Sequence, residues 1–278
     1  MKSLFDKVTL RTSKLTTNAY STSFSLGIKA LGKKYQNPIY AIYGFVRYAD
    51  EIVDTFHDYD KEKLLKRFRR DTYRAIDEGI SLNPILHSFQ MTVNQYGIDN
   101  ELTETFLDSM KMDIYKHRYD REGYKRYILG SAEVVGLMCL KVFLDGDEKE
   151  YQRLKPYAMG LGSAFQKINF LRDLHADVNN LERVYFPELN GGRFDEETKK
   201  AIENDIEADF RQGYEGIKLL PKSTRFGVWL AYVYFYALFR KIKKLQPETI
   251  MSERVRIPNR RKYRLLFTTY IRHSFNIL

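Results

Sequence analysis

Apolar residues return every three or four positions through nearly all of the 278-residue chain, which is the period of the α-helix. Alternating β-branched runs bounded by Asn-Gly or Asp-Gly turns do not recur. Short turn signals separate long periodic segments, as in antiparallel helices joined by short loops. These signals are Asn37-Pro38, Gly79–Pro84, Gly97–Asp99, Asp145–Asp147, Pro187–Gly192 and Pro221. We expect an all-α fold and, because no linker or repeat divides it, a single domain over residues 1–278.

Several classes of protein are disfavoured by composition. The N-terminal segment has charges scattered through it and lacks the apolar core of a secretory signal. The longest stretch without charge, residues 226–239, is shorter than the ~20 residues that span a bilayer. The single cysteine, Cys139, excludes a disulfide within the chain and is typical of a reducing compartment. We expect a cytoplasmic protein, with peripheral contact at the inner face of the membrane left open.

The net charge of +10 and the pI near 9.4 point to anionic partners. Nucleic acid, an anionic membrane surface and phosphorylated small molecules all meet that condition. Basic residues are concentrated in residues 240–264, where acidic residues are few. We expect reversible contact of this region with anionic lipid and no binding of nucleic acid.

Two segments place oxygen ligands along one side of a helix. The first segment is YADEIVDTF with the residues just before it. Its polar side chains are spaced by four, three and four residues, which places them on one side of a helix. In the second, within FQKINFLRDLHADVNNLERVYFP, the steps are three, four and four. The first ladder is Tyr43, Arg47, Asp50 and Asp54, and the second is Gln166, Asn169, Asp173 and Asp177. Each ladder has an arginine beside its carboxylates, namely Arg47 and Arg172.

Carboxylates among apolar residues are costly to bury unless a cation compensates their charge. Mg²⁺ takes one or two carboxylates per ion and completes its shell with water and substrate phosphate. The paired ladders therefore predict a diphosphate held between two helices by Mg²⁺, with Arg47 and Arg172 binding the remaining phosphate charge. The five histidines lack the spacing of a zinc site, and no Gly-rich nucleotide loop or G-x-S-x-G segment occurs.

These segments resemble the squalene and phytoene synthase family, the head-to-head prenyl transferases. AIYGFVRYADEIVD (residues 41–54) is similar to the first aspartate-rich motif, in a form nearer to phytoene synthases, and QKINFLRDLHADVNNLERVYFP (166–187) is similar to the second. Weaker matches are YSTSFSLGIKAL (20–31), YILGSAEVVGLM (127–138), AYVYFYALFRKI (231–242) and ERVRIPNRRK (253–262). The sequence departs from the family pattern at His175-Ala176, where Gly-Glu is common.

The resemblance implies an isoprenoid-synthase fold in which the two motifs face each other at the mouth of a central cavity. It implies that Asp50, Asp54, Asn169, Asp173 and Asp177 hold Mg²⁺, with Mn²⁺ as a substitute. It places Tyr20, Ser21, Ser23, Tyr43, Arg47, Gln166, Arg172 and Tyr234 at the prenyl diphosphate sites, and Tyr127 near the reacting carbons.

The implied reaction joins two prenyl diphosphates through a cyclopropyl intermediate. Loss of a proton would give phytoene, whereas squalene would require NADPH, which we do not expect as a cofactor. A squalene or dehydrosqualene synthase that uses farnesyl diphosphate is the close alternative. A basic helical protein that binds membrane or nucleic acid without catalysis is the alternative of another class, and it leaves the two ladders unexplained.

Overall fold

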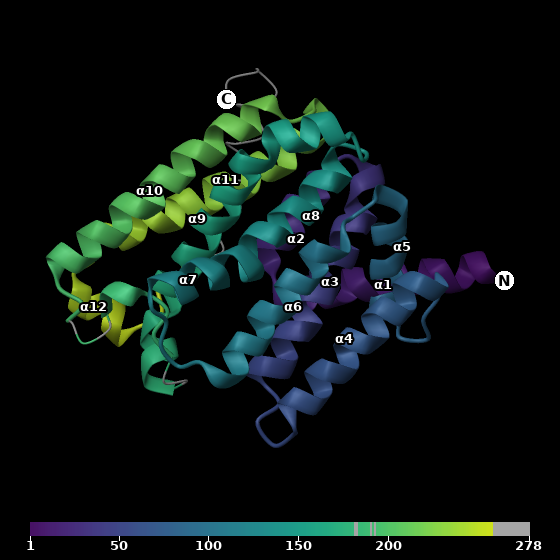
Figure 1. Ribbon diagram of the computed structural model, residues 1–278. Coiled ribbons are helices and arrows are strands. Elements are labelled where there is room, and N and C mark those ends of the chain that lie inside the picture. Colours follow the sequence, from purple (N-terminus) through teal and green to yellow (C-terminus); the bar gives the residue numbers. More distant parts are fainter. Residues whose placement is uncertain (181–182, 190, 192, 258–278) are drawn as a thin grey trace.

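The structure, a computed structural model, describes residues 1–180, 183–189, 191 and 193–257, and it confirms the expected all-α fold (Figure 1). Within this part no β-strand forms, and one isolated bridge pairs Arg118 with Val184. The helices are α1 (Lys2–Tyr20), α2 (Thr22–Lys29), α3 (Lys33–Asp54), α4 (Lys61–Glu78), α5 (Pro84–Tyr96), α6 (Asn100–Tyr115), α7 (Arg121–Ile128), α8 (Val134–Phe143), α9 (Glu148–Asn180), α10 (Glu196–Leu219), α11 (Lys222–Ile242) and α12 (Pro247–Ser252). A π-helical turn, η1 (Leu129–Glu133), joins α7 to α8, and a 3₁₀ turn, η2 (Pro187–Leu189), precedes α10.

Local signals in the sequence fix several helix ends. Asn83 caps the start of α5 by accepting hydrogen bonds from the backbone N–H of Ile85 and Leu86. Gly79 and Gly97 end α4 and α5 in the left-handed conformation, with φ of 67° and 60°. The turns predicted at Gly79–Pro84 and Gly97–Asp99 are therefore confirmed.

The turn predicted at Asn37-Pro38 is wrong, because both residues lie inside α3. Pro38 has no N–H to donate, so the helix loses one backbone hydrogen bond near its start. Its neighbours Tyr35 and Ile39 are buried in the core, and their packing holds this part of α3 helical. Packing of these neighbours in the core therefore outweighs the tendency of proline to break a helix.

Two apolar clusters support the two ladder helices. In the first, Phe45 of α3 stacks on Phe89 of α5 with ring centroids 3.9 Å apart. In the second, Phe165 of α9 stacks on Phe235 of α11 at 4.1 Å. Val228 packs against both clusters. Aromatic packing thus holds both α3 and α9 in place, independently of the polar residues that they carry.

A glycine allows η1 to lie directly on α6. A Cβ at Gly130 would come 2.5 Å from Cβ of Ser109 and 2.6 Å from the carbonyl oxygen of Thr105, both on α6. The hydrogen at this position lets the two backbones approach. The approach brings Tyr127, one turn earlier, next to Asp113, one turn beyond Ser109 on α6.

Helices long and apolar enough to cross a bilayer are not found in the described part of the chain. This agrees with the expectation from residues 226–239, which form the central part of α11.

Candidate active site

The first ladder lies along one edge of α3. Phe45, Ala49 and Val53 are at most 1% exposed. Their burial determines which side of α3 faces the core. The partly buried side chains on its edge are then Tyr43, Arg47, Asp50 and Asp54, as the spacing predicts. Arg47 is joined to Glu51 by an ion pair one helical turn on.

The second ladder lies along α9 in the same manner. Ile168, Leu171 and Leu174 are buried in the core. The side chains left partly buried on the edge are Gln166, Asn169, Asp173 and Asp177. Arg172 donates from Nε to both carboxylate oxygens of Asp173 at 3.1 Å, and Arg254 reaches the same carboxylate at 2.6 Å.

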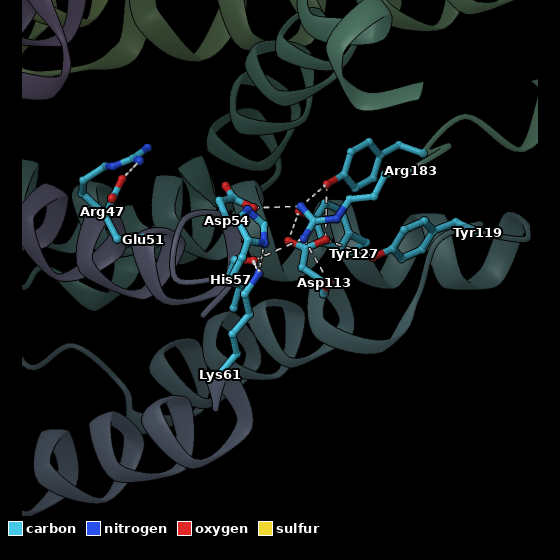
Figure 2. A network of polar contacts seen from close by, with 11 residues as sticks. Arg47, Glu51, Asp54, His57, Lys61, Asp113, Tyr119, Tyr127 and Arg183 are labelled. Atoms are coloured by element: carbon cyan, nitrogen blue, oxygen red, sulfur yellow. Dashed lines mark hydrogen bonds and ion pairs between the residues drawn. The ribbon is translucent and has the colours of Figure 1, made fainter. Parts of the chain in front are cut away.

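The two ladders face each other across one arginine. Nη1 of Arg183 donates to Oδ1 of Asp54 at 2.8 Å, and the backbone N–H of Arg183 donates to the carbonyl of Asp177, also at 2.8 Å. Figure 2 shows the Arg183 side chain between Asp54 and Asp113. Residues more than a hundred positions apart in the sequence are therefore brought into one polar site.

The electrostatics of the site favour a bound cation. Burial raises the pKa of Asp50 to about 7, and repulsion by Asp54 adds to the rise. Burial also raises the pKa of Asp177 to about 7, with repulsion by Asp173 as the next cause. The nearby arginines reduce these shifts without cancelling them. A positive ion between the helices would remove the repulsion.

An unpaired acceptor points to the same conclusion. Oδ1 of Asn169 is buried without a hydrogen-bond partner, and an amide oxygen in that state is costly unless a donor or cation reaches it. The described residues contain no group of three or more His, Cys, Asp or Glu side chains arranged to hold a metal by themselves. The donor set of separated carboxylates and one amide fits Mg²⁺, which leaves part of its shell to water and phosphate.

Several predicted diphosphate ligands gather around the two ladder arginines. The ring of Tyr20 lies 4.4 Å from the guanidinium of Arg47. The Tyr43 hydroxyl is hydrogen-bonded to Ser21. Burial is the main cause of the raised pKa of Tyr43, and the charges of Arg47, Asp50 and Arg172 also act on it. Tyr234 of α11 interacts with Arg172. Tyr43 therefore joins the N-terminal segment to both ladders.

The remaining predicted residues differ in position. Gln166 accepts a hydrogen bond from Nδ2 of Asn169 at 3.4 Å and so belongs to the second ladder. Ser23 lies in the first turn of α2 and is partly buried; for this side chain the described residues give no contact with the ladders. Tyr127 is 3% exposed, and its hydroxyl donates to Asp113 in a polar group next to the first ladder.

That group is centred on Asp113 of α6, which the sequence did not single out. Tyr127 donates to Oδ2 of Asp113 at 2.6 Å, while Tyr119 and Tyr185 donate to Oδ1 at 3.2 and 3.3 Å. Nη2 of Arg183 donates to the carbonyl of Asp113 at 3.0 Å. Asp113 therefore connects Tyr127, through Arg183, to the first ladder (Figure 2).

The departure at His175-Ala176 has a structural use. Nδ1 of His175 lies 2.8 Å from the carbonyl of Met251 in α12 and 2.9 Å from Nδ2 of Asn179. The imidazole thus ties α9 to the segment that carries Arg254. This contact brings Arg254 close to Asp173, so a residue from the ERVRIPNRRK segment does reach the second ladder.

Comparison with known families gives the class of the protein. The family model for squalene/phytoene synthase matches residues 17–195, well over half of the chain. The chain therefore belongs to the squalene/phytoene synthase family, as the two motifs predicted.

Curated relatives carry the names phytoene synthase and 4,4′-diapophytoene synthase. The phytoene synthase of Arthrospira platensis is 24% identical over 88% of this chain and 87% of its own length. The chloroplastic phytoene synthase 1 of Solanum lycopersicum is 26% identical over 80% of this chain, which spans 57% of that relative. The 4,4′-diapophytoene synthase of Staphylococcus haemolyticus is 25% identical over 68% of the chain and 66% of its own length. The chain thus spans less than two thirds of the plant relative.

Solved structures confirm the isoprenoid-synthase fold of the squalene synthase type. A dehydrosqualene synthase in complex with ligand superimposes with a TM-score of 0.80 at 17% identity, covering 97% of this chain and 98% of the other. The squalene synthase HpnC from Alicyclobacillus acidocaldarius gives 0.74 at 20% identity, covering 86% and 94%.

Proposed function

We propose that the protein catalyses the Mg²⁺-dependent head-to-head condensation of two geranylgeranyl diphosphates to phytoene, with release of diphosphate. The observation that carries the proposal is the pair of acidic ladders on α3 and α9, which Arg183 joins through Asp54 and Asp177. Membership of the family and the names of the relatives supply the reaction class.

The residues that would hold Mg²⁺ are Asp50 and Asp54 on α3 together with Asn169, Asp173 and Asp177 on α9. The ion, with Mn²⁺ as a substitute, would neutralise charge on the departing diphosphate and so assist cleavage of the allylic C–O bond. Mg²⁺ dependence is supported by the raised pKa values of Asp50 and Asp177 and by the unpaired Oδ1 of Asn169.

The chain's own residues bind and orient the two substrates. Arg47 and Arg172 present guanidinium groups toward the diphosphates, and the hydroxyl groups of Ser21 and Tyr43 lie beside them. The remaining proposed contacts to the prenyl diphosphates are Tyr20, Ser23, Gln166 and Tyr234. Hydrogen bonds to phosphate are strongest from charged donors, here Arg47 and Arg172.

Aromatic side chains would keep water from the carbocation that forms when the C–O bond breaks. Phe165, Phe170 and Phe235 form apolar walls beside the second ladder. Tyr127 lies against Phe170 with ring centroids 5.9 Å apart, and its hydroxyl proton is directed to Asp113. We propose that this hydrogen bond to Asp113 fixes the Tyr127 ring beside the reacting carbons.

A synthase that uses farnesyl diphosphate to make dehydrosqualene or squalene is the second candidate. It is favoured by the relative named 4,4′-diapophytoene synthase and shares every residue assigned above. We propose loss of a proton over reduction, so NADPH is not required. We also propose a cytoplasmic location with reversible contact at an anionic membrane, since the prenyl chains of substrate and product partition into lipid.

The test is to incubate purified protein and Mg²⁺ with farnesyl or geranylgeranyl diphosphate, each with and without NADPH, and to identify the hydrocarbon by mass spectrometry. Phytoene from geranylgeranyl diphosphate, unchanged by NADPH, is the expected result. A C30 product would transfer the assignment to the second candidate. Absence of any hydrocarbon with either substrate would contradict the proposed reaction.

A further inference from the structure

The outer face of α1 combines exposed apolar side chains with cations. Leu4, Val8 and Leu15 are 63%, 48% and 70% exposed. Lys7, Arg11 and Lys14 are exposed between them at helical spacing, so that both kinds of side chain share one face. These six residues are called the α1 face below.

The opposite side of α1 is fixed to the protein. Thr9, Ser13 and Thr17 are buried, and the Ser13 hydroxyl is 2.6 Å from that of Ser88 on α5. The α1 face is therefore a rigid surface and does not depend on a helix that folds only on binding.

The positive charge of the α1 face is not neutralised by α1 itself. The only acidic residue of the helix, Asp6, is held by Nε2 of His87 at 2.9 Å and by Lys2 at 3.1 Å. Lys7 and Arg11 form no ion pair with another described residue, and Lys14 lies 5.7 Å from the ring of Tyr40. Three cations on this face are thus available to an anionic partner.

An open concavity of about 230 Å³ lies among these cations. It is lined by Lys7, Leu10, Arg11, Lys14 and Asn37. Three positive side chains around a hollow suit a phosphate group, whereas the leucine and the neighbouring apolar side chains suit a hydrocarbon chain.

Two further apolar side chains lie at the same end of the molecule. Leu82 is 91% exposed and Ile80 is 45% exposed, in the loop between α4 and α5. The loop is held near α1 because the backbone N–H of Ser81 donates to Nδ1 of His87, whose other nitrogen binds Asp6. Figure 1 shows the N-terminal part of α1 projecting beside this loop at the edge of the molecule.

We propose that the α1 face lies on an anionic lipid bilayer. Basic side chains interleaved with exposed aliphatic ones are typical of helices at the membrane interface, where the cations meet headgroup phosphates and the apolar groups enter the acyl boundary. Nucleic acid would use the cations but leave the leucines in water. A second copy of α1 facing the first would oppose like charges.

The basic region at residues 240–264 is less available than the sequence predicts. Nζ of Lys241 donates to the carbonyl of Arg256 at 2.8 Å, and Nζ of Lys243 pairs with Glu207 at 2.7 Å. Residues 258–264 lie outside the described part of the chain. Lys241 and Lys243 are thus engaged within the protein, whereas Lys7 and Arg11 of the α1 face form no ion pair with a described residue.

The orientation of α1 connects the membrane to the candidate site. The helix ends at Tyr20, whose ring lies on Arg47 of the first ladder. A bilayer along the α1 face would therefore lie within the length of one helix of the first ladder. Only this last step rests on the proposed function, because the lipid contact itself follows from exposure and charge.

The first test measures sedimentation of the protein with vesicles of phosphatidylcholine and phosphatidylglycerol. In the variant Lys7→Gln/Arg11→Gln/Lys14→Gln the partition coefficient should fall at least about tenfold, because three attractions to the surface are lost. Binding of the parent should also weaken as salt rises. A matched control removes three exposed cations from α4, in Lys63→Gln/Lys66→Gln/Arg67→Gln, and should retain most binding.

A second variant, Leu4→Ser/Val8→Ser/Leu15→Ser, keeps every charge and should also lose at least about tenfold in binding, because apolar burial is removed. Equal losses in the α4 control, or unchanged binding in both α1 variants, would overturn the proposal. So would preferential binding of duplex DNA, or a parent dimer that the α1 variants convert to monomer. Turnover in detergent should survive in all variants; if lipid binding behaves as expected while no turnover occurs, only the proposed function fails.

Discussion

Arg183 and Asp54 form the contact that joins the two acidic motifs, with Nη1 and Oδ1 2.8 Å apart. Arg183 is 7% exposed, and the same guanidinium also donates to the carbonyl of Asp113. The segment after α9 is thereby tied to the end of α3, and Asp54 is held in a defined position before any ligand binds (Figure 2).

Replacing Arg183 by Gln should destabilise the fold and the site together. Arg183 is buried but the Asp54 side chain is 42% exposed, so losing this pair and the hydrogen bond to the Asp113 carbonyl should cost about 1–3 kcal/mol in the free energy of unfolding, measured by urea denaturation. The Mg²⁺ concentration for half-maximal activity should rise about 10- to 100-fold, the usual effect of removing a group that orients a metal ligand. Arg193→Gln, an exposed charge loss ten residues on, is the control. Equal effects in both variants would contradict the bridging role.

Removing the charge of a ladder carboxylate should abolish most catalysis without changing side-chain shape. Asp50→Asn and Asp173→Asn are each expected to lower kcat by ~10²-fold or more, the scale of a principal electrostatic contribution. Steady-state kinetics with saturating Mg²⁺ provides the measurement. Asp58→Asn, an exposed residue just beyond α3, should leave kcat unchanged. Near-normal kcat in both ladder variants would show that these carboxylates have no catalytic role.

Chelation of divalent cations should stop the reaction. Excess EDTA is expected to remove turnover, and added Mg²⁺ should restore it, because the ladders otherwise hold mutually repelling carboxylates beside an anionic substrate. Mn²⁺ should substitute in part. The hydrocarbon formed per minute is the readout, and circular dichroism checks that the helices survive chelation. Full activity in EDTA would rule out a metal role.

The pH dependence of stability should report on Asp113. Burial raises the pKa of Asp113 from an ordinary 3.8 to about 6, while Arg183 and Tyr127 oppose the rise. Between about pH 4 and 6 the folded state then holds more protons than the unfolded state, so the free energy of unfolding falls as pH rises through this window. Two pKa units correspond to roughly 3 kcal/mol at most.

Asp113→Asn removes that titration, so its free energy of unfolding should depend less steeply on pH between 4 and 6 than that of the parent. Urea denaturation of both proteins in EDTA gives the comparison, and Asp50 and Asp177 contribute equally to each. Parallel curves would show that Asp113 titrates at its ordinary pKa in the folded protein.

The ladders could be predicted because helical periodicity alone places Asp50 and Asp54, or Asp173 and Asp177, on one side of a helix. The family motifs then supplied the prediction that the two sides face each other. Features that depend on tertiary packing were harder to predict from the sequence. Pro38 was misplaced because its local preference says nothing about the burial of Tyr35 and Ile39.

Asp113 was missed for a different reason. In the sequence it is one of several acidic residues in α6, such as Asp108, which is exposed. Its burial depends on three tyrosines from two other segments, and Tyr185 lies in the segment after α9. Arg183 and Tyr185 stood within the quoted second motif, but only the fold shows that they reach α3 and α6.

The position of Tyr127 depends on the number of residues in the π-helical turn η1 as well as on their identity. A π turn holds one residue more than an α turn, so deleting a single position within Leu129–Glu133 would restore an ordinary helix. Since successive residues in an α-helix are rotated by about 100°, Tyr127 would then swing away from Asp113 while α8 kept its place. A deletion within this turn should therefore displace Tyr127 even when every remaining residue is unchanged.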